Sequence, residues 1–160
     1  MRRTILIVED TEDCRKILEM SLSRIAGVIV RSVATAEEAL HYVASGEICA
    51  LVTDLGLPHM NGFDLIEFAR SQSGGSKLPI LVVSGESGQD TLARVTALGA
   101  GGFVAKPFSP SEVRRELLRL IGRSGRESVQ GRREGVTRDS RDQARDSRKG
   151  ALRNAEHCHG

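Results

Sequence analysis

The chain has 160 residues, an apolar share of 39% and a formal net charge of +2. This length suits one domain of common size, and its core must be aliphatic because the sequence has no Trp and one Tyr. No apolar run approaches the ~20 residues of a membrane helix, and the short N-terminal run is followed by acids instead of a cleavage site. Three widely spaced cysteines predict free thiols, so we expect a cytoplasmic protein without a membrane span.

Charge divides the chain into two parts. Residues 1–122 hold 13 Lys/Arg and 15 Asp/Glu, whereas residues 123–160 hold 10 and 6. The second part is rich in Arg, Asp, Ser and Gly, and its only aliphatic residues larger than Ala are Val129, Val136 and Leu152. Such a segment buries too little apolar surface to offset its ordering entropy. We therefore predict a folded domain over 1–122 and a disordered tail over 123–160.

Five short runs rich in Val, Ile and Leu follow one another along the first part. The runs are residues 4–8, 28–33, 48–53, 78–83 and 101–105. Their nearly continuous apolar character is typical of strands that are covered on both faces. Segments with helical spacing of apolar residues follow each run. This alternation predicts an α/β fold, a doubly wound parallel sheet of five strands with five helices.

Local signals support the ends of several of these helices. Residues 35–38 (TAEE) and 109–112 (SPSE) have the pattern of a capping box, with Pro110 at the first helical position. Gly46 and Gly99 stand where helices are expected to stop.

Polar residues stand where the predicted strands end. They are Glu9 and Asp10 after the first strand, Asp54 after the third, Ser84 after the fourth and Lys106 after the fifth. Open parallel sheets bind ligands outside the carboxyl ends of their strands. We therefore expect these five side chains to converge on one pocket.

The convergence has a chemical consequence. Three carboxylates repel one another unless a pKa rises or a cation binds, and an all-oxygen site suits Mg²⁺. Lys106 supplies a second positive charge. Such a pocket can hold a phosphoryl group while one carboxylate acts as the nucleophile that forms an aspartyl-phosphate.

At this point the sequence resembles a known family. The segments VED (8–10), DLGLPHMNG (54–62), VVSGE (82–86) and FVAKPF (103–108) match, in order, the motifs of receiver domains of bacterial two-component response regulators. The resemblance covers residues 3–121 and is to the single-domain, chemotaxis-regulator type. It implies a flavodoxin-like receiver fold.

The resemblance also implies residue roles. Asp54 would be the phosphoacceptor, and Mg²⁺ would be held by Glu9, Asp10, Asp54 and the backbone carbonyl of Gly56, with Asp10 a more direct ligand than Glu9. Ser84 would be the switch hydroxyl.

Three further roles follow from the last matching segment. Lys106 would pair with the acceptor and then with its phosphate, and the Lys106–Pro107 bond would be cis. Phe103 would be the aromatic switch, although a static core position is the alternative. It stands where Tyr is frequent in the family.

The implied function is that of a signalling protein, not of an enzyme with an external substrate. A sensor histidine kinase or histidine phosphotransfer protein would phosphorylate Asp54, and a protein target would bind the surface of helix 4, strand 5 and helix 5. Two alternatives stay open: a phosphorelay intermediate, and a receiver-fold scaffold that acts without phosphorylation. The tail has mixed charge and no aromatic residues, which does not favour nucleic-acid binding. The oligomeric state, the cognate kinase and the phosphate lifetime stay undetermined.

Overall fold

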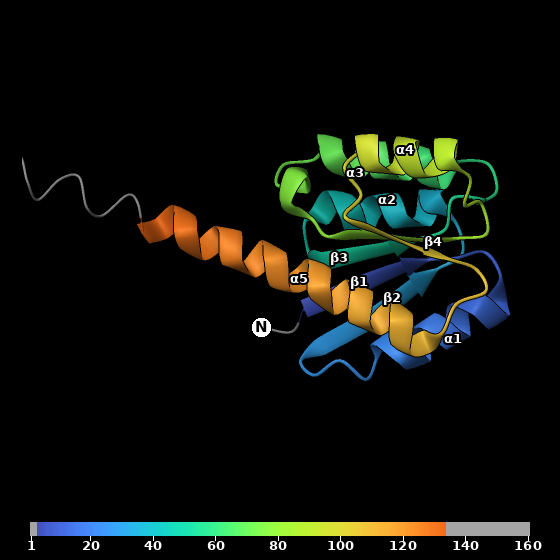
Figure 1. Cartoon of the computed structure of the whole chain (residues 1–160), viewed down its shortest axis with the longest axis horizontal. Helices are drawn as coiled ribbons and strands as arrows, with labels where there is room; N and C mark the ends of the chain where they lie inside the picture. The colour runs from blue at the N-terminus through green and yellow to red at the C-terminus, as the bar shows by residue number, and fades with distance from the viewer. Residues whose placement is uncertain (1–2, 134–160) are drawn as a thin grey trace, which may run out of the picture. The chain divides into compact units, whose positions relative to one another are not determined.

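The fold is built on one parallel sheet (Figure 1). The computed structural model describes residues 3–133. Five strands pair in the order β2-β1-β3-β4-β5. Their bounds are β1 Arg3–Val8, β2 Val28–Val33, β3 Ile48–Thr53, β4 Ile80–Ser84 and β5 Gly102–Ala105. The order reverses beside β1, so the carboxyl ends of β1 and β3 are neighbours at the switch point of the sheet.

Helices cover both faces of this sheet. Their bounds are α1 Glu12–Leu22, α2 Ala36–Ser45, α3 Gly62–Ser71, α4 Gln89–Ala97 and α5 Pro110–Arg133, with a 3₁₀ turn η1 at Gly75–Lys77. In Figure 1, α2, α3 and α4 lie on one side of the sheet, and α1 and the start of α5 lie on the other. The predicted doubly wound architecture is confirmed.

Alternation along the strands divides the core in two. On β1, Leu6 and Val8 belong to the cluster that α2, α3 and α4 cover, while Ile5 and Ile7 belong to the cluster under α1 and α5. All four side chains are fully buried. Successive residues of a strand face opposite sides, so a strand covered twice must be apolar at every position. This burial explains the continuous apolar runs in the sequence.

The helix ends follow the predicted signals. Thr35 Oγ1 accepts a hydrogen bond from the N–H of Glu38, as a capping box requires, and α5 begins at Pro110 after Ser109. Gly46 and Gly99 have φ angles of 70° and 87°, a left-handed conformation that glycine adopts without steric cost. Within residues 3–133, no helix is long and apolar enough to cross a membrane.

The last helix differs from the prediction. It continues to Arg133, so residues 123–133 of the predicted disordered tail are helical. Apolar periodicity ends near Ile121, but Arg, Glu and Gln have a high helix propensity, which an analysis of apolar periodicity does not register. The chain divides into two units between Ser124 and Gly125. The rest of the predicted tail, 134–160, lies outside the described residues.

Candidate functional site

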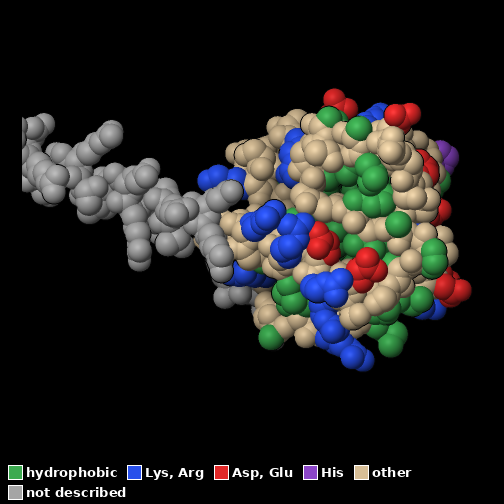
Figure 2. Space-filling model, in the orientation of Figure 1, with side chains coloured by type: hydrophobic (Ala, Val, Ile, Leu, Met, Phe, Trp, Pro, Cys, Tyr) green, Lys and Arg blue, Asp and Glu red, His purple; other side chains and the backbone are tan. Residues whose placement is uncertain are grey.

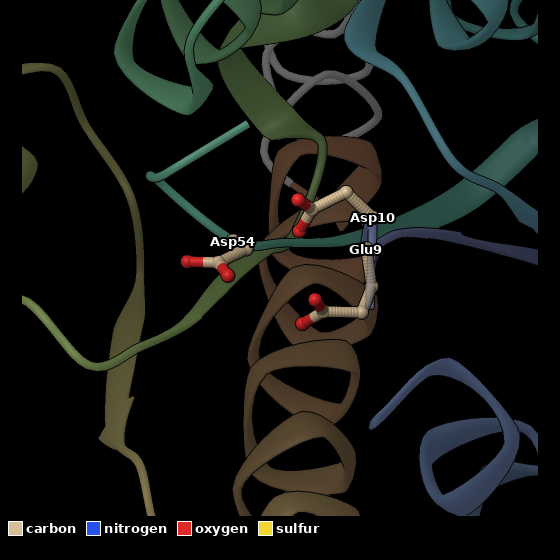
Figure 3. Close-up of side chains that lie close together, drawn as sticks. All are labelled: Glu9, Asp10 and Asp54. Atoms are coloured by element: carbon tan, nitrogen blue, oxygen red, sulfur yellow. The ribbon is translucent and has the colours of Figure 1, made fainter. Parts of the chain in front are cut away.

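Three carboxylates meet at the carboxyl ends of β1 and β3. Glu9 and Asp10 follow β1 directly and Asp54 follows β3. One oxygen of each lies within 4.8 Å of an oxygen of the other two. Figure 3 shows the three side chains extending to the same side of the strand ends. The parallel register, in which Val8 is opposite Thr53, places the two chain segments at the same height.

Lys106 completes this cluster from the end of β5. Its Nζ lies 2.7 Å from Glu9 Oε2 and 2.7 Å from Asp54 Oδ2. The side chains of Glu9, Asp54 and Lys106 are 1%, 10% and 21% exposed, so both ion pairs are largely removed from solvent. The Lys106–Pro107 peptide bond is cis, as expected from the sequence. One ammonium therefore bridges two carboxylates from different strands.

The two buried carboxylates have partners for both oxygens. Glu9 accepts the Thr11 N–H at 3.0 Å on Oε1 and Lys106 on Oε2. Asp54 accepts the Leu55 N–H at 2.6 Å on Oδ1 and Lys106 on Oδ2. The Asp10 carboxylate is exposed, and within residues 3–133 it has no hydrogen bond or ion pair. Asp10 is thus the carboxylate whose oxygens are free to bind an incoming ligand.

The two buried acids differ in their pKa directions. Burial raises the pKa of Glu9 above its usual range, and the hydrogen bonds from Lys106 and Thr11 offset this only in part. For Asp54, burial also acts upward, but hydrogen bonding by Lys106 and Ser84 outweighs it and the pKa falls below its usual range. Burial lowers the pKa of Lys106, yet its bonds to Asp54 and Glu9 dominate and raise it strongly. The ammonium and the Asp54 carboxylate are therefore both charged at neutral pH.

Three predicted site residues remain, one at the end of β4, one in the loop after β3 and one on β5. Ser84 ends β4, is 1% exposed and accepts the Glu86 N–H at 3.2 Å on its hydroxyl. Gly56 is exposed, and a Cβ placed on it would lie 3.5 Å from a Glu86 carboxylate oxygen. Phe103 is half-buried on β5, where it packs against the core cluster under α2, α3 and α4. Its role as a switch and the ligand role of the Gly56 carbonyl stay predictions.

Sequence reasoning missed several partners of the site. The N–H groups of Thr11 and Leu55 hold carboxylate oxygens, and Arg15 donates to the backbone carbonyl of Glu9 at 2.9 Å. Cys14 is free, as the sequence predicts, and burial raises the pKa of its thiol, although the nearby Lys106 ammonium acts to lower it. A backbone N–H is present at every residue except proline, so the sequence does not show which of them bind the carboxylates. The separation of six residues between Glu9 and Arg15 predicts no contact by itself.

The sequence model of the response regulator receiver domain matches residues 5–118. The chain belongs to the response regulator receiver family. Receivers act in two-component signalling, where they interact with histidine kinases and downstream targets.

Curated relatives fall into two size classes. The chain is 29% identical to the chemotaxis protein CheY1 of Helicobacter pylori over 119 residues, which are 74% of this chain and 96% of that protein. It is 33% identical over 129 residues to the transcriptional regulatory protein GltR of Pseudomonas aeruginosa, covering 81% of this chain and 53% of GltR. The chain thus spans about half the length of GltR and nearly the whole of CheY1.

Solved structures agree with the fold. A putative response regulator from Chloroflexus aurantiacus has a TM-score of 0.70 at 30% identity, over 76% of this chain and 99% of that one. The non-phosphorylated HemR receiver domain of Leptospira biflexa has a TM-score of 0.68 at 32% identity, over 75% and 94%.

Proposed function

We propose that this receiver accepts a phosphoryl group on Asp54 from a histidine kinase or a histidine phosphotransfer protein. In this step a bond forms between an Asp54 carboxylate oxygen and phosphorus, the phosphorus–nitrogen bond of the donor breaks, and the electron pair stays on the donor imidazole. The observation that carries the proposal is the Lys106 ammonium, held 2.7 Å from Asp54 Oδ2 in a largely buried pocket. It is already in place to neutralise negative charge at the acceptor.

The acidic cluster fits Mg²⁺. Three carboxylates face one ammonium, an excess of two negative charges that one divalent cation would balance. Carboxylate oxygens are the ligands that Mg²⁺ prefers, and Asp10 has the free oxygens to serve as the most direct of them. Glu9, Asp54 and the Gly56 carbonyl would complete the protein ligands. When bound, the ion would offset the charge of the phosphoryl oxygens.

Phosphorylation is proposed to act as a switch between two states. The Ser84 hydroxyl and Phe103 would move, and the surface of α4, β5 and α5 would change its affinity for a target protein. Hydrolysis of the aspartyl-phosphate by water would reset the domain, so the protein takes part in its own phosphotransfer and is not an enzyme with an external substrate. Cytoplasmic location belongs to the same proposal, which the free thiols of Cys14 and Cys49 support.

Intact mass after treatment with acetyl phosphate and Mg²⁺ tests the proposal. We expect the wild type to gain one phosphoryl group, and both Asp54→Asn and a chelator-treated sample to gain none. A beryllofluoride titration, followed by amide chemical shifts, covers the case in which hydrolysis outpaces detection. Absence of both mass gain and beryllofluoride binding in a folded protein would refute the acceptor role and favour the scaffold alternative.

A second pair of experiments separates a terminal switch from a phosphorelay intermediate. Protein phosphorylated on Asp54 would be mixed with candidate histidine phosphotransfer proteins and followed by mass. Transfer of the phosphoryl group to a histidine indicates a relay, whereas hydrolysis without transfer indicates a terminal switch.

A further inference from the structure

Glu9 has a hydrogen-bond partner for each of its polar groups, and one of these partners is an arginine. Its N–H donates to the Val33 carbonyl at 3.1 Å, and its two carboxylate oxygens bind Thr11 and Lys106. The backbone carbonyl of Glu9 accepts a hydrogen bond of 2.9 Å from Arg15 Nη1. Arg15 is half-buried in the first turn of α1. Both the side chain and the main chain of Glu9 are therefore held in place.

Asp10 depends on this backbone for its position. Its carboxylate has no hydrogen bond or ion pair with any residue whose side chain the structure describes, so no contact of its own fixes it. It nevertheless lies beside the carboxylates of Glu9 and Asp54 (Figure 3). The Glu9 carbonyl and the Asp10 N–H belong to one planar peptide unit, so the direction of that carbonyl sets the direction in which the chain enters Asp10. The hydrogen bond from Arg15 thus acts on the carboxylate that is most open to a metal ion.

Arg15 differs from other cations of the domain in its choice of partner. Among the described side chains, no carboxylate lies within ion-pair distance of its guanidinium. Lys16 and Arg119, by contrast, each pair with a glutamate of their own helix. On the face seen in Figure 2, Lys and Arg side chains likewise lie beside Asp and Glu side chains. The guanidinium of Arg15 is instead committed to the backbone between β1 and α1.

We propose that Arg15 is a positioning residue of the Mg²⁺ site, a role that rests on the function proposed for the acidic cluster. It holds the Glu9–Asp10 peptide so that the Asp10 carboxylate stays beside the other two. Arg15 has two opposing effects on a divalent cation. Its positive charge repels the ion, whereas its hydrogen bond preorganises a ligand, and partners of this kind are worth about tenfold or more in metal affinity. The second effect dominates.

Titration of the full chain with Mg²⁺ separates the two effects, because they have opposite signs. Arg15→Met removes the charge and the donor together, and we expect the dissociation constant for Mg²⁺, followed by amide chemical shifts, to rise about tenfold. Lys16→Met is the matched control, since it removes one positive charge from the next position of α1. Its affinity for Mg²⁺ should be unchanged or higher. Arg15→Lys keeps the charge but places an ammonium on a shorter chain, so its affinity should lie between those of the wild type and Arg15→Met.

Amide chemical shifts of the metal-free proteins give a readout that a general loss of stability would not give. In Arg15→Met the shifts of Asp10 and Thr11 should change, whereas those of Leu55 and Gly56 in the loop after β3 should stay as in the wild type. Thermal unfolding without metal establishes that each variant is folded. If Arg15→Met does not fold, Arg15→Lys becomes the deciding variant.

The outcomes are distinct. A dissociation constant of Arg15→Met equal to or below that of the wild type would overturn the proposal, as would an equal rise in Lys16→Met. Wild-type affinity in Arg15→Lys, where that variant decides, would overturn it as well. Failure of the acceptor proposal looks different, because the wild type itself would then gain no phosphoryl group and bind no beryllofluoride. A wild type that binds no Mg²⁺ would remove the metal site and the role of Arg15 with it.

Discussion

Lys106 is the residue whose removal tests the electrostatic account of the site most directly. Replacing it with methionine keeps an unbranched chain of similar length but leaves Glu9 and Asp54, which are 1% and 10% exposed, without their shared cation. We expect Lys106→Met to destabilise the metal-free domain, because buried charges that lose their partner are costly.

The magnitude follows from the two distances of 2.7 Å. At an effective dielectric of ~20, each pair attracts by roughly 6 kcal/mol before desolvation. Breaking a fully buried pair costs about 3–5 kcal/mol in net terms. Because the Lys106 side chain is 21% exposed and water reaches that side of the pocket, we expect a loss of about 2–3 kcal/mol. In a domain of this size the melting temperature would fall by roughly 10 °C.

Thermal and urea unfolding without metal are the assays. Adding Glu9→Gln to Lys106→Met should restore at least half of the lost free energy of unfolding, because it removes one unpaired charge. Lys77→Met, at an exposed lysine of η1, is the control and should change the stability by less than about 0.5 kcal/mol.

The pH dependence has a definite sign. Lys106 lowers the pKa of both acids, so both values rise in the variant. The deficit relative to the wild type should be full at neutral pH and should shrink as the pH falls through those raised values. The raised pKa of Lys106 stabilises the wild type at every pH below its unfolded value of about 10.5 and is lost only as the pH rises above that. If neither low pH nor Glu9→Gln reduces the loss of stability, the electrostatic explanation is wrong and the loss arises from packing.

Further outcomes are expected elsewhere in the domain. Gly62→Ala should lower the free energy of unfolding by at least about 2 kcal/mol, because a Cβ there would lie 2.1 Å from the Asp54 carbonyl oxygen. Gly85→Ala is the control and should be nearly neutral, because the space around Gly85 is open. Equal effects of the two substitutions in chemical unfolding would contradict this. Mg²⁺ at 100 times its dissociation constant should raise the free energy of unfolding of the wild type by about 2.7 kcal/mol, and its melting temperature should rise accordingly. Asp10→Asn should remain folded but lose most of this stabilisation. An unchanged stabilisation in the variant would exclude Asp10 as a ligand. Thr35→Ala should cost about 1 kcal/mol, since it removes the acceptor for the Glu38 N–H at the start of α2, and a smaller change would mean that solvent replaces the cap.

The sequence by itself determined the fold and predicted that three carboxylates and Lys106 lie together at one edge of the sheet. Apolar runs of strand length predict strands buried on both faces, and caps such as Thr35 act over three or four residues, so both are visible in a short window. The topological rule for parallel sheets then brings Glu9, Asp54 and Lys106 to one edge without any coordinates. The same local reasoning ended α5 near Ile121, because it followed burial and not the helix preference of charged residues.

Only the tertiary structure decided how the side chains share their partners. Lys106 and Glu9 are 97 positions apart, and their 2.7 Å contact depends on the register of strands that no local pattern encodes. Because Glu9 uses its oxygens for Lys106 and Thr11, Asp10 is the carboxylate with free oxygens. The sequence alone does not show this difference between the two neighbouring acids. Ser21 of α1 likewise donates a hydrogen bond to the backbone carbonyl of Pro110 at the start of α5, 89 positions away in the sequence, because the fold packs these two helices on the same face of the sheet.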